Sequence, residues 1–494
     1  MEKLSINLAD YGYSPTQDGF ISGIGSSENL DQLNKALAAE QITGRNTADL
    51  TTASGAPLKV ESLEKTLKHL TFRESDIRLW KDIPKKPAYN TVEEYNQQTS
   101  YGANHGGFNR EGELPEEEDS TFVRRAQLVK YLGVTKSVTH QMQLVHTMVG
   151  SIMERTIKDG TMWILRALNQ GLYFGNEKIV PEQFNGFLAQ QMQSDAWANY
   201  GDYMNSENVI DARGAQLGET HIESGANSIV ENYGLATQLY APPAVLSNFV
   251  KNFYGNKFIV PNSPSLEKGI MGQRVQAFDS QFGQIGLNHD IFFKKLPSKT
   301  TGSPATSQKA PNAPTISVAA VAADAAAKWS STDAGNYFYG VVAINRFGES
   351  AMGVAGSAVA VVAGGAADIT ITDGGGTYGA TGYRIYRTKN GAPATSEFYP
   401  LFEVSVSDVA AGYDGGQSGT PGDVRDRNRF LPDCDQAMLV QFDNEVVEFA
   451  QLAPLMKMDL AVLSPAFRFM ILLYGTPFLY APKKMVRIIN IGRN

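Results

Sequence analysis

The residue pattern of the chain changes abruptly at two points, and this places one domain inside another. A segment rich in Pro, Ser and Thr, typical of a linker, begins after Leu296 and spans 297–307. Short apolar runs separated by glycine turns follow, and after Phe430 a mixed pattern of helices and strands resumes. The apolar runs predict strands at 315–321, 337–345, 358–362, 369–372, 382–388 and 401–406. We therefore predict an all-β sandwich, residues 297–428, inserted into an α+β host and ending in the charged segment 423–429.

The N-terminal part of the chain carries few apolar residues. Residues 1–60 are polar and rich in Gly, Ser and Thr, which predicts an extended arm with one short helix near residues 30–39. A disordered terminus is the alternative interpretation. A helix is predicted over Ser62–Leu70, because Leu63, Leu67 and Leu70 would share one of its faces.

A long polar loop and a strand complete the region 61–139. Residues 88–118 contain glycines and charges but too few apolar residues to form a core of their own. Ordered loops of about 30 residues usually serve a function or lie against a partner. The β-branched run Thr121–Thr139 that follows is predicted to be a strand.

The longest periodic segment is helical. Apolar residues recur at helical spacing from Gln141 to Gly171, with a possible kink at Asp159-Gly160, and predict a helix of roughly 45 Å at ~1.5 Å per residue. We assign residues 140–180 to this helix and 181–296 to an α/β domain. That domain has predicted helices at 228–239 and 244–253 and predicted strands at 275–278 and 283–293. The chain returns to the host over 429–494, with apolar runs at 467–474 and 485–491.

Charge and cysteine content exclude several classes of protein. The chain has 43 basic and 51 acidic residues, a net charge of -8, which argues against binding nucleic acid by neutralising phosphates. Cys434 is the only cysteine, so an intrachain disulfide is excluded and assembly in a reducing cytosol is expected. Residues 1–25 do not predict a signal peptide, and the apolar runs are too short to span a bilayer.

The sequence contains three patterns that resemble catalytic or metal-binding motifs, and each has a simpler structural interpretation. Gly374–Gly379 matches G-x-G-x-x-G, but the strand-like Gly382–Arg387 follows it where a dinucleotide site needs a helix, so a turn is predicted. His140 and His146 are six residues apart and would lie on different helix faces. The acidic run Glu116–Asp119 could bind a divalent cation, but we favour a solvated acidic loop or a partner for arginines on a neighbouring subunit. Arg124 and Arg125 lie close enough in sequence to compete for these carboxylates. We predict no catalytic, cofactor-binding or metal-binding residue and no enzyme activity.

The order of these parts resembles the major capsid proteins of tailed bacteriophages with the Hong Kong 97-type fold. In that family an N-terminal arm, an extended loop, a spine helix and an axial domain precede a final return through the peripheral domain. The corresponding segments here are 1–60, 88–138, 140–172, 180–296 and 430–494. Shorter phrases that resemble capsid subunits are Glu111–Pro115, Val129–Val134, Ile229–Pro243, Phe278–Ile285 and Tyr480–Lys484.

The resemblance implies a structural function. Subunits of this family form the hexamers and pentamers of an icosahedral phage head around double-stranded DNA, so the expected location is the virion, after assembly in the bacterial cytoplasm. Portal, scaffolding and decoration proteins are the implied partners, besides other copies of the chain. Some members crosslink through a lysine and an asparagine, helped by a buried glutamate, but no such triad aligns here, although Lys85, Lys86 and Lys130 lie near the loop. The candidate intersubunit residues are Tyr101, Arg110, Glu111, Glu116, Glu117, Glu118, Arg124 and Arg125.

The insert resembles fibronectin type III or immunoglobulin-like modules. Tyr337–Glu349 resembles the central strand and its turn, and Gly382–Arg387 and Phe402–Val404 resemble later strands. The cysteine pair of immunoglobulins is absent, so the resemblance extends only to the sandwich class. An alternative function is surface adhesion, with the sandwich binding a glycan. A large metabolic enzyme is a third possibility, but the polar constellation it needs was not found.

Overall fold

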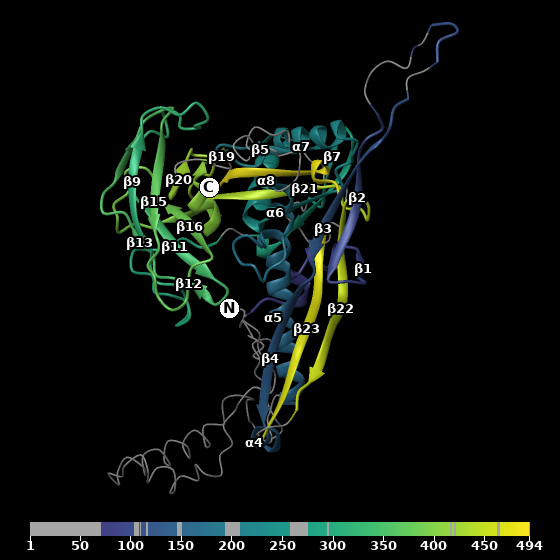
Figure 1. Ribbon diagram of the computed structural model, residues 1–494, viewed down its shortest axis with the longest axis vertical. Helices are drawn as coiled ribbons and strands as arrows, with labels where there is room; N and C mark the ends of the chain where they lie inside the picture. The colour runs from purple at the N-terminus through teal and green to yellow at the C-terminus, as the bar shows by residue number, and fades with distance from the viewer. Residues whose placement is uncertain are drawn as a thin grey trace, which may run out of the picture. The chain divides into compact units, whose positions relative to one another are not determined.

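The computed structural model describes most of the chain after residue 70. The described residues are 71–102, 108, 110–114, 117–145, 151–192, 208–256, 275–293, 296–414, 417–418, 421–461 and 465–493. The arm predicted over 1–60 and the helices predicted at 30–39 and 62–70 lie outside them. Figure 1 shows the arrangement of the helices and strands, which belong to one compact unit, Leu70–Asn494.

A four-stranded sheet joins segments from both ends of the described chain. Its order is β1-β22-β23-β4, where β23 pairs antiparallel with both β22 and β4, and β1 pairs parallel with β22. The predicted strand 121–139 is divided at Val129 into β3, which belongs to a hairpin, and β4. The bounds are β1 Lys85–Pro87, β3 Thr121–Leu128, β4 Lys130–Thr139, β22 Val447–Asp459 and β23 Ala466–Leu479.

The long helix α5 (Ile152–Phe174) packs on one face of this sheet through Ile164, which contacts Phe469 and Ile471. A short helix, α4 (His140–Leu144), precedes it, and residues 146–150 are not described. The pair Asp159-Gly160 lies inside the uninterrupted helix. A side chain at Gly160 would place its Cβ 2.8 Å from Ile471 Cδ1, so glycine allows the close approach of α5 to the sheet.

A buried polar cluster connects α5 to its neighbours. The Asp290 carboxylate, which is fully buried, accepts hydrogen bonds from Asn169 Nδ2 (2.9 Å) and the Tyr173 hydroxyl (3.0 Å). Trp80, on the short helix α3 (Leu79–Asp82), donates its backbone N–H to Asn169 Oδ1 and lies edge-on to Phe449 of β22 at 4.9 Å. The apolar core around this cluster includes Leu168, Leu172, Phe184 and Phe187, the last from α6 (Phe187–Met192).

A six-stranded sheet, β5-β24-β21-β6-β8-β7, forms the second part of the host. Its core includes side chains of α7 (Glu219–Glu231) and α8 (Pro243–Asn256), and it also depends on the C-terminal residues, which supply β21 and β24. The predicted helix 244–253 lies within α8, and the predicted strands 275–278 and 283–293 overlap β7 and β8, with a 3-10 turn at 291–293. The bounds are β5 Val209–Asp211, β6 Gln238–Ala241, β7 Ala277–Ser280, β8 Gly283–His289, β21 Cys434–Val440 and β24 Met485–Gly492.

The helix predicted at 228–239 was wrong in both bounds. Helix α7 begins nine residues earlier, at Glu219, and ends at Glu231; Tyr233 follows with φ 60°. Residues 238–241 form strand β6, which is paired on both sides and buries Leu239 and Tyr240 completely. A short, fully buried apolar run has no strand alternation, so periodicity alone does not distinguish it from a helix.

The insert contains two five-stranded sheets that share one core, together with a two-stranded sheet, β10-β14. One sheet contains β11, β12, β13, β16 and β17; the other contains β9, β15, β18, β19 and β20. Tyr339 and Ile385 of the first sheet pack with Ile369 and Val424 of the second. The bounds are β9 Thr315–Val321, β10 Gly335–Tyr337, β11 Tyr339–Asn345, β12 Gly348–Glu349, β13 Gly353–Val354, β14 Val359–Val361, β15 Ala366–Thr372, β16 Gly382–Arg387, β17 Tyr399–Ser405, β18 Tyr413–Asp414, β19 Gln417–Ser418 and β20 Asp423–Asp426, with the helix α9 at Val406–Ala411.

Two segments at the borders of the insert differ from their sequence-based description. The predicted linker 297–307 is hydrogen-bonded to the insert, since Lys299 exchanges backbone hydrogen bonds of 2.9 and 2.7 Å with Phe398, and Thr306 donates its N–H to the Glu349 carbonyl. The charged segment 423–429, described from the sequence only as the end of the insert, contains strand β20. The charges of these segments have partners far away in the sequence, and local composition does not reveal them.

A buried ion pair joins strand β20, formed by the charged segment, to strand β16. Arg387 Nη1 is 2.6 Å from Asp426 Oδ2, and the two side chains are 1% and 2% exposed. The hydroxyl of Tyr339 donates a second hydrogen bond to Asp426 Oδ2, at 2.9 Å. The guanidinium also lies 4.7 Å from the centre of the Trp329 ring. Asp426 thus supplies the negative charge that makes burial of Arg387 tolerable.

We predict that Asp426→Ala destabilises the insert by about 3–5 kcal/mol, because a buried guanidinium would lose its counter-charge. The measurement is hydrogen exchange of β11 and β16 amides in the full chain. The matched control is Glu182→Ala, which removes an exposed ion pair with Arg346 (3.3 Å; side chains 53% and 57% exposed) and should cost less than about 1 kcal/mol. Equal exchange in the two variants would contradict the assigned role of Asp426.

Candidate functional site on a projecting hairpin

Strands β2 (Val92–Ser100) and β3 form an antiparallel hairpin that is not paired with either host sheet in the described residues. Burial alternates along both strands with a period of two. On one face Val92 lies opposite Leu128 and Gln98 lies opposite Phe122, and all four are exposed. The other face, with Tyr95 opposite Arg125, is half-buried. The hairpin therefore presents one covered face and one free face.

The covered face is held by aromatic contacts near the end of β23. The Tyr95 ring lies edge-on to Phe478 at 5.5 Å and to Tyr480 at 4.9 Å. Gln97, two residues further on the same face, donates from Nε2 to the backbone carbonyl of Tyr480. These contacts attach the base of the hairpin to the four-stranded sheet.

Charge and hydrogen bonding reinforce this attachment, which we call the hairpin anchor (Lys86, Tyr95, Gln97, Glu448, Phe478 and Tyr480). Lys86 Nζ donates to the Tyr480 hydroxyl at 2.6 Å, and that hydroxyl donates to Glu448 Oε2 at 2.8 Å. Lys86 Nζ also lies 4.7 Å from the Phe478 ring centre. Burial and the adjacent Glu448 carboxylate raise the pKa of the Tyr480 phenol well above its ordinary value, so the phenol stays protonated and donates.

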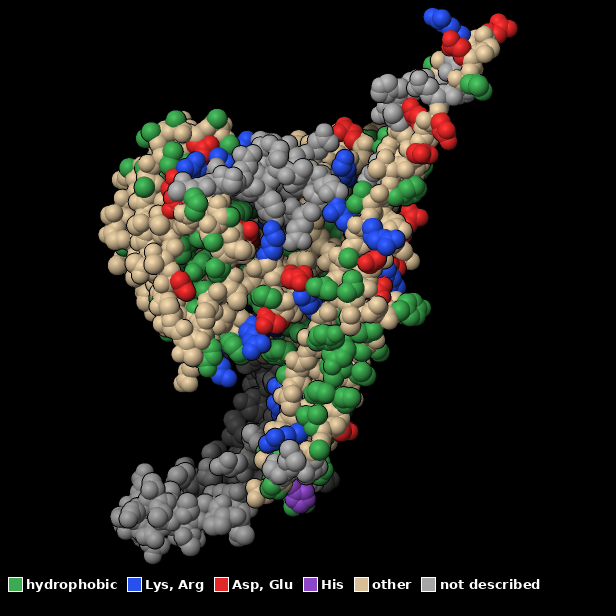
Figure 2. Space-filling view, viewed as in Figure 1, with side chains coloured by type: hydrophobic (Ala, Val, Ile, Leu, Met, Phe, Trp, Pro, Cys, Tyr) green, Lys and Arg blue, Asp and Glu red, His purple; other side chains and the backbone are tan. Residues whose placement is uncertain are grey.

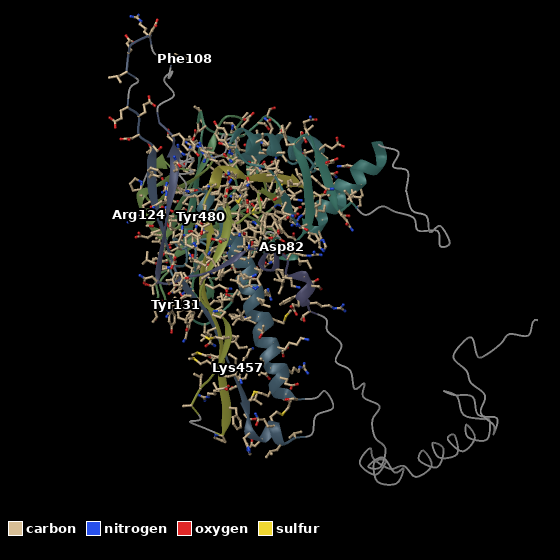
Figure 3. The ribbon with its side chains drawn as sticks, turned by 90° about the vertical axis from the view of Figure 1, so that its right-hand side faces the viewer. Asp82, Phe108, Arg124, Tyr131, Lys457 and Tyr480 are labelled. Atoms are coloured by element: carbon tan, nitrogen blue, oxygen red, sulfur yellow. The ribbon has the colours of Figure 1, made fainter. Side chains whose placement is uncertain are left out.

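The structure places the predicted charged residues along the free part of the hairpin. Tyr101 is 89% exposed, and Arg110, Glu111, Glu117 and Glu118 are exposed. Glu116 lies outside the described residues. Figure 3 shows Phe108 at the far end of the loop and Arg124 on the hairpin itself.

Arg124 and Arg125 of β3 lie close enough in sequence to compete for the acidic run 116–119, but the structure gives Arg124 another carboxylate partner. Its Nη1 lies 3.4 Å from Glu94 Oε2, across the hairpin on β2. Arg125 donates from Nε to Gln97 Oε1 at 3.4 Å. The strand register explains this, because Arg124 lies opposite Asn96 and Arg125 opposite Tyr95. The exposed carboxylates Glu111 and Glu117 therefore lie on a part of the loop beyond these arginine contacts.

The sequence analysis missed the apolar residues of the loop. Phe108 is 99% exposed, Leu114 is 92% exposed and Tyr89 is 87% exposed. A turn at Arg110–Glu113, with Gly112 at φ 88°, separates Phe108 from Leu114. Large apolar side chains isolated in a polar segment without a core were the available signal, because a partner surface can bury them where the segment itself cannot.

A second surface with unusual apolar exposure lies on the four-stranded sheet, on the face opposite α5; we call it the outer sheet face. Met456 and Met458 of β22, 40% and 47% exposed, lie opposite Leu472 and Met470 of β23. Tyr131 of β4 is 60% exposed and contacts Tyr474 edge-on at 4.8 Å. Figure 2 shows apolar side chains gathered over β4, β22 and β23. Methionine side chains on such a face can adapt to a partner of varied shape.

The structure gives the positions of the motifs that were considered for metal or cofactor binding. Among them no group of three or more His, Cys, Asp or Glu residues is arranged to hold a metal ion. The Gly374–Gly379 motif forms a loop between two strands, β15 and β16, as predicted, with Gly375 and Gly376 at positive φ. Cys434 is buried in β21. No helix in the described part of the chain is long and apolar enough to cross a membrane.

Comparison with known proteins finds relatives that match over most of the chain. The chain is similar to phage major capsid proteins. The major capsid proteins of Staphylococcus phages S25-3 and K are each 24% identical over 484 residues, which covers 93% of this chain and 96% of the relative. A putative major capsid protein of Enterococcus phage phiEF24C is 25% identical and covers 91% of this chain and 93% of the relative. No family model matches the chain.

Solved structures with a similar arrangement have little sequence identity to this chain. A structure from Mycobacterium phage Bobi has a TM-score of 0.43 with 8% identity and covers 88% of this chain and 97% of that one. The SrpI encapsulin of Synechococcus elongatus has a TM-score of 0.40, also with 8% identity, and covers 91% of this chain and 96% of that one.

We predict that Tyr480→Phe loosens the base of the hairpin without unfolding the chain. The substitution removes one hydroxyl, which accepts from Lys86 and donates to Glu448, and hydrogen bonds to charged groups contribute about 1.5–3 kcal/mol each. Amide exchange in β2 should therefore accelerate about tenfold or more. The control is Tyr399→Phe in the insert, whose hydroxyl donates to Glu397 at 3.2 Å near the surface. If β2 exchange were the same in wild type and Tyr480→Phe, the anchor would not hold the hairpin.

Proposed function

We propose that this chain is the major capsid protein of a tailed bacteriophage, a structural subunit of the virion head. The observation that carries the proposal is the similarity to major capsid proteins over 93% of the chain and 96% of those relatives. The match spans the host and not one module alone. The alternative function, an adhesin that binds glycans through the insert, has no support among these relatives.

The proposed activity is self-assembly, and the two exposed surfaces supply its physical basis. The hairpin loop carries the exposed side chains of Phe108 and Leu114 together with the exposed carboxylates of Glu111, Glu113 and Glu117, a composition of apolar anchors and polar residues that suits an interface. The outer sheet face carries Met456, Met458 and Tyr131 in an exposed apolar strip. In the assembly the hairpin of one copy covers the outer sheet face of a neighbour, so every subunit both donates and receives the same contact. Repetition around hexamers and pentamers makes weak contacts cooperative.

The separation between a fixed base and a free loop suits this assembly. Ordering a flexible residue costs about 1–2 kcal/mol, so a loop without a covering neighbour has little reason to order. The hairpin anchor offsets that cost at the base of the hairpin, and contact with a neighbouring subunit would offset it for the loop.

The parts of the chain receive specific roles in this proposal. Residues 1–60 form the arm, 61–139 the hairpin region, 140–180 the spine helix, 181–296 the axial domain and 429–494 the return through both host sheets. The insert, 297–428, is an immunoglobulin-like module on the outside of the shell, which the two sheets around one core support. Portal, scaffolding and decoration proteins are the further partners. The net charge of -8 suits a wall that encloses DNA without adhering to it.

The direct test is negative-stain microscopy and sedimentation of the purified chain, alone and with the scaffolding factors of its phage. Closed shells, sheets or six-fold rings are the expected result. A stable monomer or dimer under every condition would contradict self-assembly.

We predict that the double substitution Phe108→Ser and Leu114→Ser abolishes assembly but leaves the subunit folded. Both side chains are more than 90% exposed, so their loss removes contacts to a neighbour and none within the subunit core. Sedimentation measures assembly, and circular dichroism measures the fold. The control is Val362→Ser and Phe347→Ser on the insert, at 51% and 39% exposure, which should assemble normally. Normal shells from the loop variant would remove the hairpin from the interface.

A mixing experiment tests whether the hairpin meets the outer sheet face. Met456→Glu and Met458→Glu together should block assembly, because they place charge on an apolar contact surface. This face variant retains an intact hairpin, and the loop variant retains an intact face. Mixed together, they should form heterodimers detectable by sedimentation but no closed shells. If the two variants do not associate at all, the hairpin contacts a different surface.

A further inference from the structure

A cleft of about 550 Å³ lies on the other side of the four-stranded sheet, beside α5. It is bounded by the 3-10 turn η3 (Glu74–Asp76), α3 and β1 on one side and by α5 on the other, with β22 contributing to its floor. Neither the hairpin nor the outer sheet face takes part in it. Its lining residues are Glu74, Ile77, Trp80, Lys81, Lys85, Lys158, Thr161, Met162, Leu165 and Leu455.

The floor of the cleft is apolar and continuous with the core. Ile77 and Leu165 are buried, and the partly buried Trp80, Met162 and Leu455 pack against them. A concave apolar floor of this size accepts one or two large apolar side chains, and its exposure to water is unfavourable while it is empty. It therefore favours an occupant that brings apolar side chains over one that brings only charge.

The rim of the cleft is basic, although the chain as a whole is acidic. Three lysines and one glutamate give the lining a net charge of +2, against -8 for the chain. Among the described residues, neither Lys81 nor Lys158 forms an ion pair. Lys85 has internal contacts: its Nζ donates to the Trp80 carbonyl at 3.0 Å and lies 4.6 Å from the Trp80 ring centre. Lys81 and Lys158 are thus the two cations of the rim that can bind an external carboxylate.

We propose that this cleft is the docking site for an acidic amphipathic helix of another protein. The occupant inserts two large apolar side chains onto the floor and places carboxylates against Lys81 and Lys158, since apolar and acidic residues three or four positions apart share one side of a helix. Nucleic acid fits less well, because a phosphate backbone would leave the apolar floor uncovered. The inference goes beyond the proposed function: it assigns a binding site and a recognition chemistry to a partner other than a second copy, and it holds whether or not the chain forms shells.

The test measures binding of a synthetic probe to the full-length chain by fluorescence anisotropy. The probe is a dye-labelled helical peptide of about 14 residues with leucines at i, i+3, i+4 and i+7 and glutamates on its flanks. Reversal of the rim charges, Lys81→Glu with Lys158→Glu, should weaken binding about tenfold or more, and added salt should weaken binding to the wild type. The matched control, Lys251→Glu with Lys309→Glu, reverses two exposed lysines elsewhere and should bind like the wild type.

Two further measurements locate the occupant and identify its class. A photo-crosslinker on the probe should attach to peptides that contain residues 77–85 or 158–165. The proposal is overturned if the rim variant binds as well as the wild type, or if the crosslinks map elsewhere. It is also overturned if a peptide of residues 106–119 competes more strongly than the probe, which would assign the cleft to a second copy, or if duplex DNA does so, which would assign it to nucleic acid. Because the probe assay uses the unassembled chain, its result is separate from the outcome of shell assembly.

Discussion

Both host sheets depend on strands from the last sixty residues of the chain. Strands β21 and β24 lie side by side in the six-stranded sheet, and β22 and β23 occupy the middle of the four-stranded sheet. Strand β23 pairs with β4 in an unbroken register from Ala466↔Thr139 to Gly475↔Lys130, more than three hundred residues apart in sequence. Neither host sheet can be completed before β21 to β24, which follow the insert in the sequence, have paired. Such non-local pairing makes folding slow compared with helical proteins of similar size.

Sequence patterns correctly predicted the helices and strands that are determined by residues close together in the sequence. Strand β9 was predicted with its observed bounds, Thr315–Val321, because alternation and flanking turns mark it. The long helix was predicted as one element over Gln141–Gly171 because its apolar residues form a stripe, and α5 buries that stripe, with Ile164 and Leu168 inside. Its N-terminal part was wrong, because α4 ends at Leu144 and Val145 is extended. The charged residues of the loop were named as candidate intersubunit contacts, and those that the structure describes are exposed. Phe108 and Leu114 were overlooked because apolar residues were searched for as core.

The remaining features depend on contacts that the sequence does not display. Arg387 and Asp426 form a buried pair 39 residues apart, and neither has a local sign of its partner. Arg124 pairs with Glu94, a partner that local sequence does not indicate, because the register between β2 and β3 places Glu94 within reach. The insert is also bound to the host beyond its two chain connections: Arg213 donates to the carbonyls of Asn428 and Lys328, each at 2.9 Å. These hydrogen bonds help to fix the position of the insert on the host.

The continuity of β3 and β4 has a mechanical consequence. Only Val129 separates the two strands, so tension applied at the loop passes along β3 directly into β4. The hydrogen bonds between β4 and β23 run perpendicular to that tension. A pull on the loop therefore loads the whole register in shear, and the bonds must break together instead of one after another. The four-stranded sheet therefore resists stretching along the axis of β3 and β4 far more than it resists peeling of β4 away from β23. A shell wall that is stretched from inside needs resistance in that direction.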